Sequence, residues 1–209
     1  MSTLFDVQHQ LTFYGAYHSN RINVIIHVIC VPLILCSYPP KSELKSGLVM
    51  GTKIPVPSFV PDIHHQFSDY LVFELNGPAI YAALCLAYYF ALEPMAALLY
   101  TPQVILSLLS ATAFARGASH ITQATILHAF CWVAQFIGHG VAEKRAPALL
   151  DNLLQAVVLA PFFVHLEVLF ALGYRPQMHK DLKNEIGKEI TKIRKAEGDM
   201  RRATAAKAN

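Results

Sequence analysis

Residues 14–36 read YGAYHSNRINVIIHVICVPLILC, and within this stretch a polar, aromatic segment gives way to a long apolar one. The triplet His18-Ser19-Asn20 has helix-capping chemistry, so it predicts a break between two helices. We expect a short amphipathic helix over 1–17 and a second helix over about 22–36. His27 lies inside the apolar part of the second helix, where a polar side chain needs a partner.

A second polar cluster interrupts the apolar sequence at residues 135–147, QFIGHGVAEKRAP. His139 and Glu143 are four residues apart, a spacing that puts both on one face of an α-helix. Gly138 and Gly140 flank the histidine and would allow a neighbouring helix or a substrate to approach closely. An ionisable group at mid-bilayer costs about 2.5–3.5 kcal/mol, so the two clusters together indicate a functional site.

The composition predicts a membrane protein. Of the 209 residues, 54% are hydrophobic and only 15% are charged, whereas about 25% are charged in a typical soluble domain. Residues 41–70 are polar and contain several prolines, and we interpret them as a loop. Four further apolar stretches are each long enough, at about 1.5 Å per residue, to cross a hydrocarbon core of about 30 Å: 71–92, 94–114, 121–142 and 153–172.

We therefore expect an all-α fold. It would be a multi-pass integral membrane bundle of four to five apolar helices over 1–175, followed by a basic helix or tail over 176–209. The tail is typical of a solvated cytosolic segment or of one that binds anionic lipid headgroups. The orientation stays open, because a cytosolic tail would place the basic pair Lys144-Arg145 on the lumenal side.

The histidines are candidate metal ligands. His18 and His27 would face opposite sides of one straight helix, but the predicted break lets them converge. Together with His139 they form a three-imidazole set that suits Fe(II), Zn or Mn, and Glu143 is a further candidate ligand. The alternative is that each histidine is a core residue bonded to a backbone carbonyl. The sequence leaves open whether the site includes His128, His120 or Glu167.

Several classes of function have no support in the sequence. The H-x-x-x-H and H-x-x-H-H spacings of membrane desaturases are absent, as are the G-x-S-x-G elbow, the G-x-G-x-x-G loop and the P-loop. The basic tail has no interleaved aromatic residues, so we expect no nucleic-acid partner.

Two blocks of the sequence carry long mixed motifs. The first comprises Phe13-Tyr14, Tyr17-His18, Asn20, Asn23-Val24, Ile26-His27, Val31-Pro32 and Ile34-Leu35. The second comprises Gln135-Phe136, Gly138-His139-Gly140, Glu143-Lys144-Arg145, Pro147-Ala148-Leu149, Asp151-Asn152-Leu153, Leu159-Ala160-Pro161-Phe162, Glu167, Leu169-Phe170 and Leu172-Gly173. Both resemble the motifs of the fungal endoplasmic-reticulum 2-hydroxy fatty acid dioxygenases. The middle of the chain matches that family only in hydropathy.

The resemblance implies a multi-pass enzyme of the endoplasmic reticulum membrane that acts in α-oxidation during phytosphingosine breakdown. Such an enzyme uses Fe(II) and O2 to convert a long-chain 2-hydroxy fatty acid, such as 2-hydroxypalmitate, into the acid one carbon shorter. The family's motif histidines map onto His18, His27 and His139, which are the implied iron ligands.

The resemblance also implies roles for the polar residues around these histidines. Glu143 would complete the ligand set or orient a histidine, and Asn23 would hydrogen-bond to a ligand or to the substrate. Lys144, Arg145 and Tyr14 would bind the substrate, whose anionic headgroup suits the two cationic side chains. The acyl chain would lie among the apolar helices.

Two other functions stay open from the sequence. One is a non-enzymatic helical membrane protein that binds lipid and uses the three histidines only as structural hydrogen-bonding groups. The other is a zinc-dependent lipid hydrolase. The metal content of the protein separates the enzyme from the binding protein, and a dependence of turnover on O2 and Fe(II) excludes the hydrolase.

Overall fold

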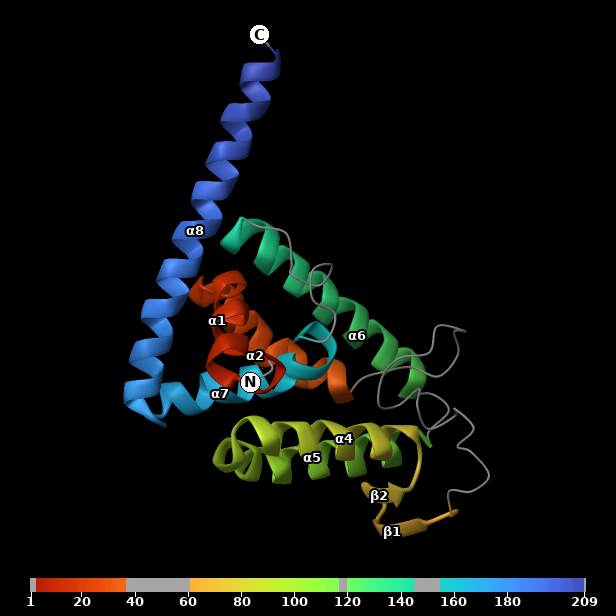
Figure 1. Cartoon of the computed structure of the whole chain (residues 1–209). Coiled ribbons are helices and arrows are strands. Elements are labelled where there is room, and N and C mark those ends of the chain that lie inside the picture. The colour runs from red at the N-terminus through yellow and green to blue at the C-terminus, as the bar shows by residue number, and fades with distance from the viewer. Residues whose placement is uncertain (1–2, 37–60, 117–119, 145–154, 209) are drawn as a thin grey trace.

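The computed structural model describes residues 3–36, 61–116, 120–144 and 155–208, which are mostly helical (Figure 1). A single two-stranded sheet accompanies the helices within these ranges, and the predicted all-α membrane bundle is confirmed. The helical elements are η1 (Thr3–Phe5), α1 (Val7–Tyr17), α2 (Arg21–Cys36), α4 (Gly77–Leu92), α5 (Pro94–Phe114), α6 (His120–Ile137), η2 (Gly138–Glu143), η4 (Gln155–Leu159), α7 (Ala160–Ala171) and α8 (Pro176–Ala208).

The predicted break near residue 19 is confirmed. Helix α1 ends at Tyr17, α2 begins at Arg21, and the two helices are bent by 112° relative to each other. Asn20 caps α2, because its side-chain oxygen accepts a hydrogen bond from the Ile22 amide at 2.9 Å. Asp6 caps α1 in the same way through the amide of His9. The bend brings the end of α1 over the first turns of α2.

A hairpin replaces part of the predicted loop over 41–70. Strand β1 (His64–Ser68) pairs antiparallel with β2 (Leu71–Glu74). The hairpin also shortens the apolar stretch predicted over 71–92, because α4 begins only at Gly77 and has 16 residues. At about 1.5 Å per residue α4 is shorter than a hydrocarbon core of about 30 Å. Residues 37–60, which include the first part of the predicted loop, lie outside the described ranges.

Helices α4 and α5 form a packed pair joined at Glu93. The carboxylate of Glu93 is buried, with its side chain 5% exposed, and its Oε2 forms an ion pair with Arg175 at 2.8 Å. The Tyr174 hydroxyl donates to Glu93 Oε1 at 2.9 Å. These contacts tie the turn between α4 and α5 to the turn between α7 and α8. A buried carboxylate requires such partners.

The main core lies where α1, α4, α5, α7 and α8 meet. Phe162, Phe163 and Leu166 of α7 are fully buried there, together with Leu182 of α8. Helix α8 crosses α1 closely, since a Cβ on Gly15 would collide with a terminal carbon of Ile186. The first turns of α8 therefore pack on the bundle, while its C-terminal half extends away from it (Figure 1). The domain boundary at 175/176 stays a prediction.

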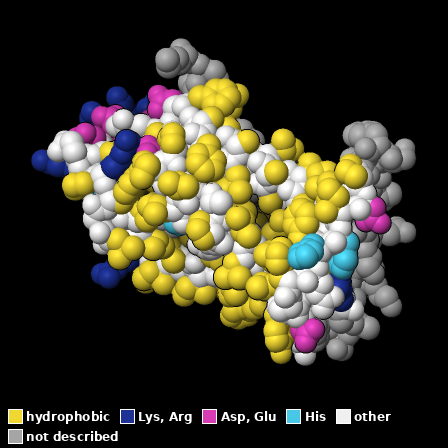
Figure 2. Space-filling model, turned by 90° about the horizontal axis from the view of Figure 1, so that it is seen from below, with side chains coloured by type: hydrophobic (Ala, Val, Ile, Leu, Met, Phe, Trp, Pro, Cys, Tyr) yellow, Lys and Arg dark blue, Asp and Glu magenta, His cyan; other side chains and the backbone are white. Residues whose placement is uncertain are grey.

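The surface carries a large apolar area. Figure 2 shows hydrophobic side chains gathered over the face formed by the α4–α5 layer, with most Lys and Arg side chains at one end of the molecule. Among the residues that the structure describes, two helical segments, Pro94–Phe114 and Thr122–Glu143, are long and apolar enough to cross a membrane, or up to four if each bent helix pair is one span. Exposed apolar side chains on these segments include Leu98, Leu106, Ile126, Phe130 and Phe136.

Candidate metal centre

Three imidazoles from three different elements converge near the bend between α1 and α2. His18 follows the last residue of α1, His27 lies on α2, and His139 lies on η2. The ring centroids are 4.4 Å apart for His18 and His27, 4.8 Å for His18 and His139, and 5.0 Å for His27 and His139. One ligand nitrogen from each ring lies within 4.8 Å of the others, so the three could hold one metal ion.

Backbone carbonyls fix two of the three rings. Nδ1 of His18 lies 2.9 Å from the Tyr14 carbonyl oxygen, and Nδ1 of His27 lies 2.9 Å from that of Asn23. A carbonyl oxygen only accepts, so each Nδ1 carries the proton and donates. Each Nε2 is then left with its lone pair, which is the arrangement that second-shell hydrogen bonds impose on histidine ligands.

The third ring supports a bound cation more directly. His139 is 4% exposed, and its Nδ1 is buried without a hydrogen-bond partner among the described residues. A buried polar atom without a partner costs about 1–3 kcal/mol, and a metal ion would remove that cost. The charge that acts on this ring is the Glu143 carboxylate, which attracts a cation. The residues present therefore fit a metal ion bound by nitrogen ligands.

Glu143 holds the bend in place. Its Oε1 accepts a hydrogen bond from the Asn20 amide, and its Oε2 accepts one from the Ser19 hydroxyl at 3.0 Å. Asn20 Nδ2 donates in turn to the Ala142 carbonyl at 3.0 Å. The carboxylate thus caps the N-terminus of α2 from a distant part of the chain, where negative charge is favoured. Within the described residues, the metal-competent group consists of the three histidines without a carboxylate.

Asn23 of α2 lies against Gly138 of η2. Asn23 is completely buried, and its Nδ2 lies 3.4 Å from both the Tyr17 carbonyl oxygen and Glu143 Oε1. A Cβ on Gly138 would lie 2.5 Å from Asn23 Oδ1, whereas a Cβ on Gly140 would meet nothing within 4 Å. The predicted close approach of a neighbouring helix is therefore found at Gly138 and not at Gly140.

The segment carrying His139 and Glu143 is a π-helix, not the α-helix that the four-residue spacing assumes. The wider turn sends His139 toward the other imidazoles and Glu143 toward Ser19 and Asn20. π-Helical turns of this kind occur frequently at functional sites. Lys144 ends the segment in a left-handed conformation with φ 56° and is exposed. Arg145 lies outside the described residues.

Tyr14 covers the site from α1. Its ring stacks on His18, with centroids 4.0 Å apart and planes 14° apart, and it also contacts Phe163. The residue is 4% exposed, and its hydroxyl has no hydrogen-bond partner in the described part of the chain. Tyr14 therefore presents a buried donor beside the imidazoles.

The other histidine candidates lie apart from the three imidazoles. The Trp132 indole donates to His128 Nε2 at 2.9 Å, and the His165 ring packs against Tyr100. Glu167 is half-buried on α7 and does not belong to the group of three histidines. The side chain of His120 lies outside the described residues. Ser19 and Asn20 were predicted as capping residues, but their hydrogen bonds to Glu143 were not predicted.

Comparisons with known proteins agree with the chemistry of the site. The sequence profile of a family described as "Mpo1-like: 2-hydroxy-palmitic acid dioxygenase Mpo1-like" matches residues 4–172. A protein of Saccharomyces cerevisiae named 2-hydroxy-palmitic acid dioxygenase MPO1 is 35% identical over 189 residues, which are 88% of this chain and 91% of that protein. No solved structure matches the chain. The residues that the family profile matches include all three imidazoles and Glu143 and end before α8.

Proposed function

The chain belongs to the Mpo1-like family of 2-hydroxy-palmitic acid dioxygenases, and on this premise we propose that it is an Fe(II)-dependent enzyme. Its substrate would be a long-chain 2-hydroxy fatty acid, and its product the fatty acid one carbon shorter. The yeast relative's name states 2-hydroxy-palmitic acid, which supports this substrate class. The observation that carries the proposal is the convergence of His18, His27 and His139 within 4.8 Å.

Each residue of the site has a distinct part in this proposal. A bound Fe(II) ion would supply the one-electron chemistry that makes O2 reactive toward the 2-hydroxy acid. His18 and His27, held by the carbonyl oxygens of their own helices, present Nε2. His139 presents a buried nitrogen that needs a partner. Glu143 acts as a positioning residue, because it keeps the α1–α2 bend closed around the imidazoles.

The substrate headgroup would meet one donor and one acceptor that have no hydrogen-bond partner in the described structure. The Tyr14 hydroxyl is a buried donor, and Asn23 Oδ1 is a buried acceptor. We assign the first to the substrate carboxylate and the second to the 2-hydroxyl. Lys144 is exposed at the end of η2 and would attract the anionic headgroup toward the site. The same role for Arg145 stays a prediction from the sequence.

The apolar surface supports a multi-pass location in the membrane, which we propose to be that of the endoplasmic reticulum. An amphiphilic substrate has a headgroup and a chain that prefer different solvents. A site at the end of the span Thr122–Glu143 meets both preferences, because His139 and Glu143 lie in its last turns.

Turnover by the purified protein in lipid nanodiscs tests the proposal. Incubation with 2-hydroxyhexadecanoate and Fe(II) should give pentadecanoate only when O2 is present. Hexadecanoate, which lacks the 2-hydroxyl, is the matched control and should give no shorter acid. Equal product without O2, or equal turnover with Zn(II) in place of Fe(II), would contradict the proposal and favour a hydrolase. Binding without turnover under every condition would favour a lipid-binding protein.

A further inference from the structure

The positive charge of this protein is concentrated in α8. The helix contains nine Lys and Arg residues and five Asp and Glu residues, which give it a formal net charge of +4. The whole chain has 17 basic and 14 acidic residues. The rest of the chain therefore holds eight basic and nine acidic residues, so the entire positive excess lies in α8. The family profile ends at residue 172 and does not include this helix.

The basic residues of α8 gather on one face of the helix. At about 100° per residue, seven of the nine project within an arc of about 140° that contains no acidic residue. All seven side chains are exposed, and we call them the basic face: Lys180, Lys183, Lys188, Arg194, Lys195, Arg201 and Arg202. Within the described residues, the ion pairs of α8 leave Arg194, Lys195 and Arg201 unpaired. The basic face therefore has positive charge available for a partner.

Helix α8 begins at the side of the membrane where the candidate metal centre lies. As membrane spans, α5 and Thr122–Glu143 run in opposite directions, because residues 115–121 are too few to cross the hydrocarbon core again. Glu93, at the start of α5, and Glu143 therefore lie at the same side. Arg175 precedes α8 and forms an ion pair with Glu93, so the start of α8 lies at that side too.

From this point α8 runs across the direction of the spans. Its axis is bent by 119° from that of the segment Ala156–Ala171, and Figure 1 shows it crossing the direction of α4 and α5. Ile186, on the apolar side of α8, packs against Gly15 of α1 and holds the first turns in this orientation. A helix that starts at the membrane surface and runs across the spans follows that surface, as interfacial amphipathic helices do.

The charge of α8 selects the kind of membrane surface. Basic residues mark the cytosolic side of membrane proteins, and Lys144 ends η2 at the same side as α8. The tail and Lys144 thus face one side, whereas the order of apolar stretches in the sequence placed them on opposite sides. The cytosolic leaflet carries anionic phospholipids, whose potential acts within a Debye length of about 8 Å at physiological ionic strength.

We propose that the basic face of α8 binds the headgroups of anionic phospholipids on the cytosolic surface of the membrane. The proposal rests on the membrane location proposed above and is independent of the reaction at the three histidines. Phosphatidylcholine is neutral overall and offers no comparable attraction to Lys and Arg. The basic face of a second copy does not fit here, because the two faces carry the same charge.

Hydrogen exchange of the full chain in nanodiscs tests the proposal. Amides over 192–206 should exchange about tenfold more slowly in discs that contain phosphatidylserine than in discs of phosphatidylcholine alone. This part of α8 is informative because it extends away from the bundle, which does not protect it. Raising NaCl to about 1 M, where the Debye length is about 3 Å, should abolish the difference. Exchange over 94–114 should be slow in both kinds of disc.

Two single substitutions separate the basic face from positive charge in general. Arg201→Gln removes an unpaired cation of the face and should reduce the slowing by about fivefold, the contribution of one Lys or Arg close to an anionic surface. Lys192→Gln is the matched control, because Lys192 is also exposed but lies off the face and pairs with Glu189. It should leave the slowing unchanged. The triple variant Arg194→Gln/Lys195→Gln/Arg201→Gln should abolish the slowing.

Equal exchange over 192–206 in both kinds of disc would overturn the proposal, and so would equal effects of Arg201→Gln and Lys192→Gln. Slowing in phosphatidylcholine alone that appears only with two chains per disc would overturn it in favour of contact between copies. Fast exchange over 94–114 would reject the membrane location and this proposal with it. The predicted slowing without any product from 2-hydroxyhexadecanoate would keep the lipid-binding face and reject only the proposed reaction.

Discussion

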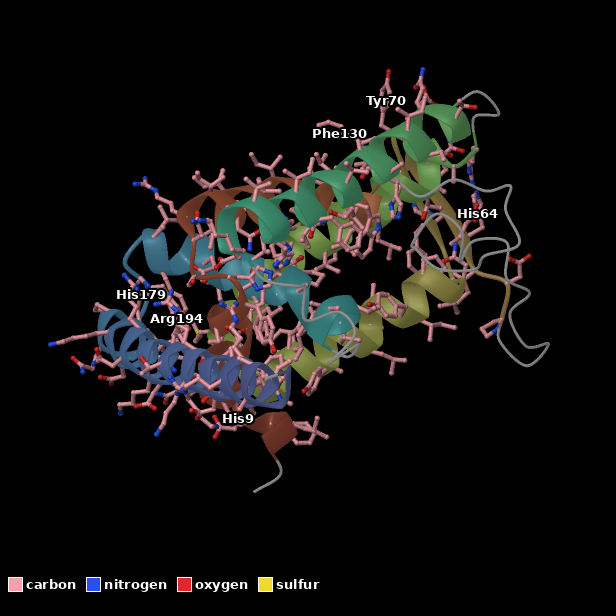
Figure 3. All side chains as sticks on the ribbon, turned by 90° about the horizontal axis from the view of Figure 1, so that it is seen from above. His9, His64, Tyr70, Phe130, His179 and Arg194 are labelled. Atoms are coloured by element: carbon pink, nitrogen blue, oxygen red, sulfur yellow. The ribbon has the colours of Figure 1, made fainter. Side chains whose placement is uncertain are left out.

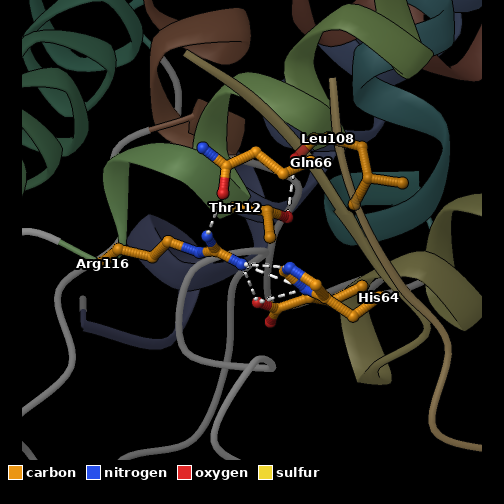
Figure 4. A network of polar contacts seen from close by, with 6 residues as sticks. His64, Gln66, Leu108, Thr112 and Arg116 are labelled. Atoms are coloured by element: carbon orange, nitrogen blue, oxygen red, sulfur yellow. Dashed lines mark hydrogen bonds and ion pairs between the residues drawn. The ribbon is translucent and has the colours of Figure 1, made fainter. Parts of the chain in front are cut away.

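Two clusters of histidine and carboxylate lie in different parts of this protein, and they differ in almost every respect that matters for binding a cation. The first is the imidazole set His18, His27 and His139 beside Glu143. The second lies on the hairpin, where His64 meets Glu74 and Arg116 (Figure 4). Figure 3 shows His64 far from His179 and Arg194, at the end of the molecule opposite α8.

In the hairpin cluster, an arginine already satisfies the acceptors. Arg116 Nη2 lies 2.9 Å from Glu74 Oε1 and 3.1 Å from His64 Nδ1, and Nη1 donates to the Gln66 side chain at 3.4 Å. A guanidinium only donates and stays charged, so it neutralises the carboxylate and repels a metal ion. The His64 side chain is also 46% exposed. This cluster fastens the hairpin to the end of α5.

In the buried cluster, the imidazole nitrogens converge on one another and a carboxylate is the neighbouring charge. His139 Nδ1 is buried and has no hydrogen-bond partner in the described ranges. Histidines beside a carboxylate therefore indicate a metal centre only when they are buried, converge on one point and have no neighbouring Lys or Arg that competes with the metal ion.

The largest expected effect is that of removing an imidazole. We expect His139→Ala to lower turnover by more than about 100-fold, because residues that merely orient metal ligands already contribute about 10- to 100-fold. The rate of pentadecanoate formation from 2-hydroxyhexadecanoate measures it. Circular dichroism of the variant checks that the helices remain. A folded His139→Ala protein with full turnover would remove this residue from the ligand set.

The next effect concerns the carboxylate that closes the bend. Glu143→Ala leaves the Asn20 amide and the Ser19 hydroxyl without their acceptor, and each unpaired donor costs about 1–3 kcal/mol if it stays buried. We expect metal affinity, measured by competition with a chelator, to fall by about 10- to 100-fold. Glu143→Gln keeps an acceptor oxygen and should lose less. Equal metal affinity in Glu143→Ala and the unmodified protein would refute a positioning role.

A smaller effect is expected where α2 and η2 approach each other. Gly138→Ala puts a Cβ 2.5 Å from Asn23 Oδ1, and such overpacking destabilises by about 1–3 kcal/mol. Gly140→Ala is the matched control, because its Cβ would meet nothing within 4 Å. Thermal unfolding of both variants in detergent gives the comparison. If the two variants unfold at the same temperature, the tight contact at Gly138 is not present in solution.

The smallest effect is expected in the hairpin cluster. His64→Ala removes a half-exposed contact to Arg116 and Glu74, and such surface pairs contribute about 0–1 kcal/mol. Turnover and metal content should be those of the unmodified protein. A loss of metal in His64→Ala would contradict the view that the hairpin cluster takes no part in metal binding.

The features predicted correctly from the sequence are those with a local signal. The capping residues at 18–20 predicted the bend between α1 and α2. The length and hydropathy of residues 94–114 predicted that this segment could span a membrane. The three histidines were expected to converge because buried imidazoles need partners and because their motifs resemble those of a metal-dependent family.

The features that were missed depend on contacts between distant residues. β1 has few β-branched or alternating apolar residues, and it forms a strand because it pairs with β2, which packs against α5. The π-helix η2 begins at Gly138, where it contacts Asn23 of α2. Hydropathy does not predict a contact between residues so far apart in the sequence. Glu93 and Arg175 are 82 residues apart, so no sequence pattern pairs them.

Metal content tests the central claim most directly. The full chain, purified in nanodiscs with Fe(II) and without O2, should retain about one iron per chain by elemental analysis, as expected for a single site. Iron should fall to background in His18→Ala, His27→Ala and His139→Ala and stay at the original level in His64→Ala. Iron retained at about one per chain in all three single variants of the imidazole set, each still folded, would contradict the account.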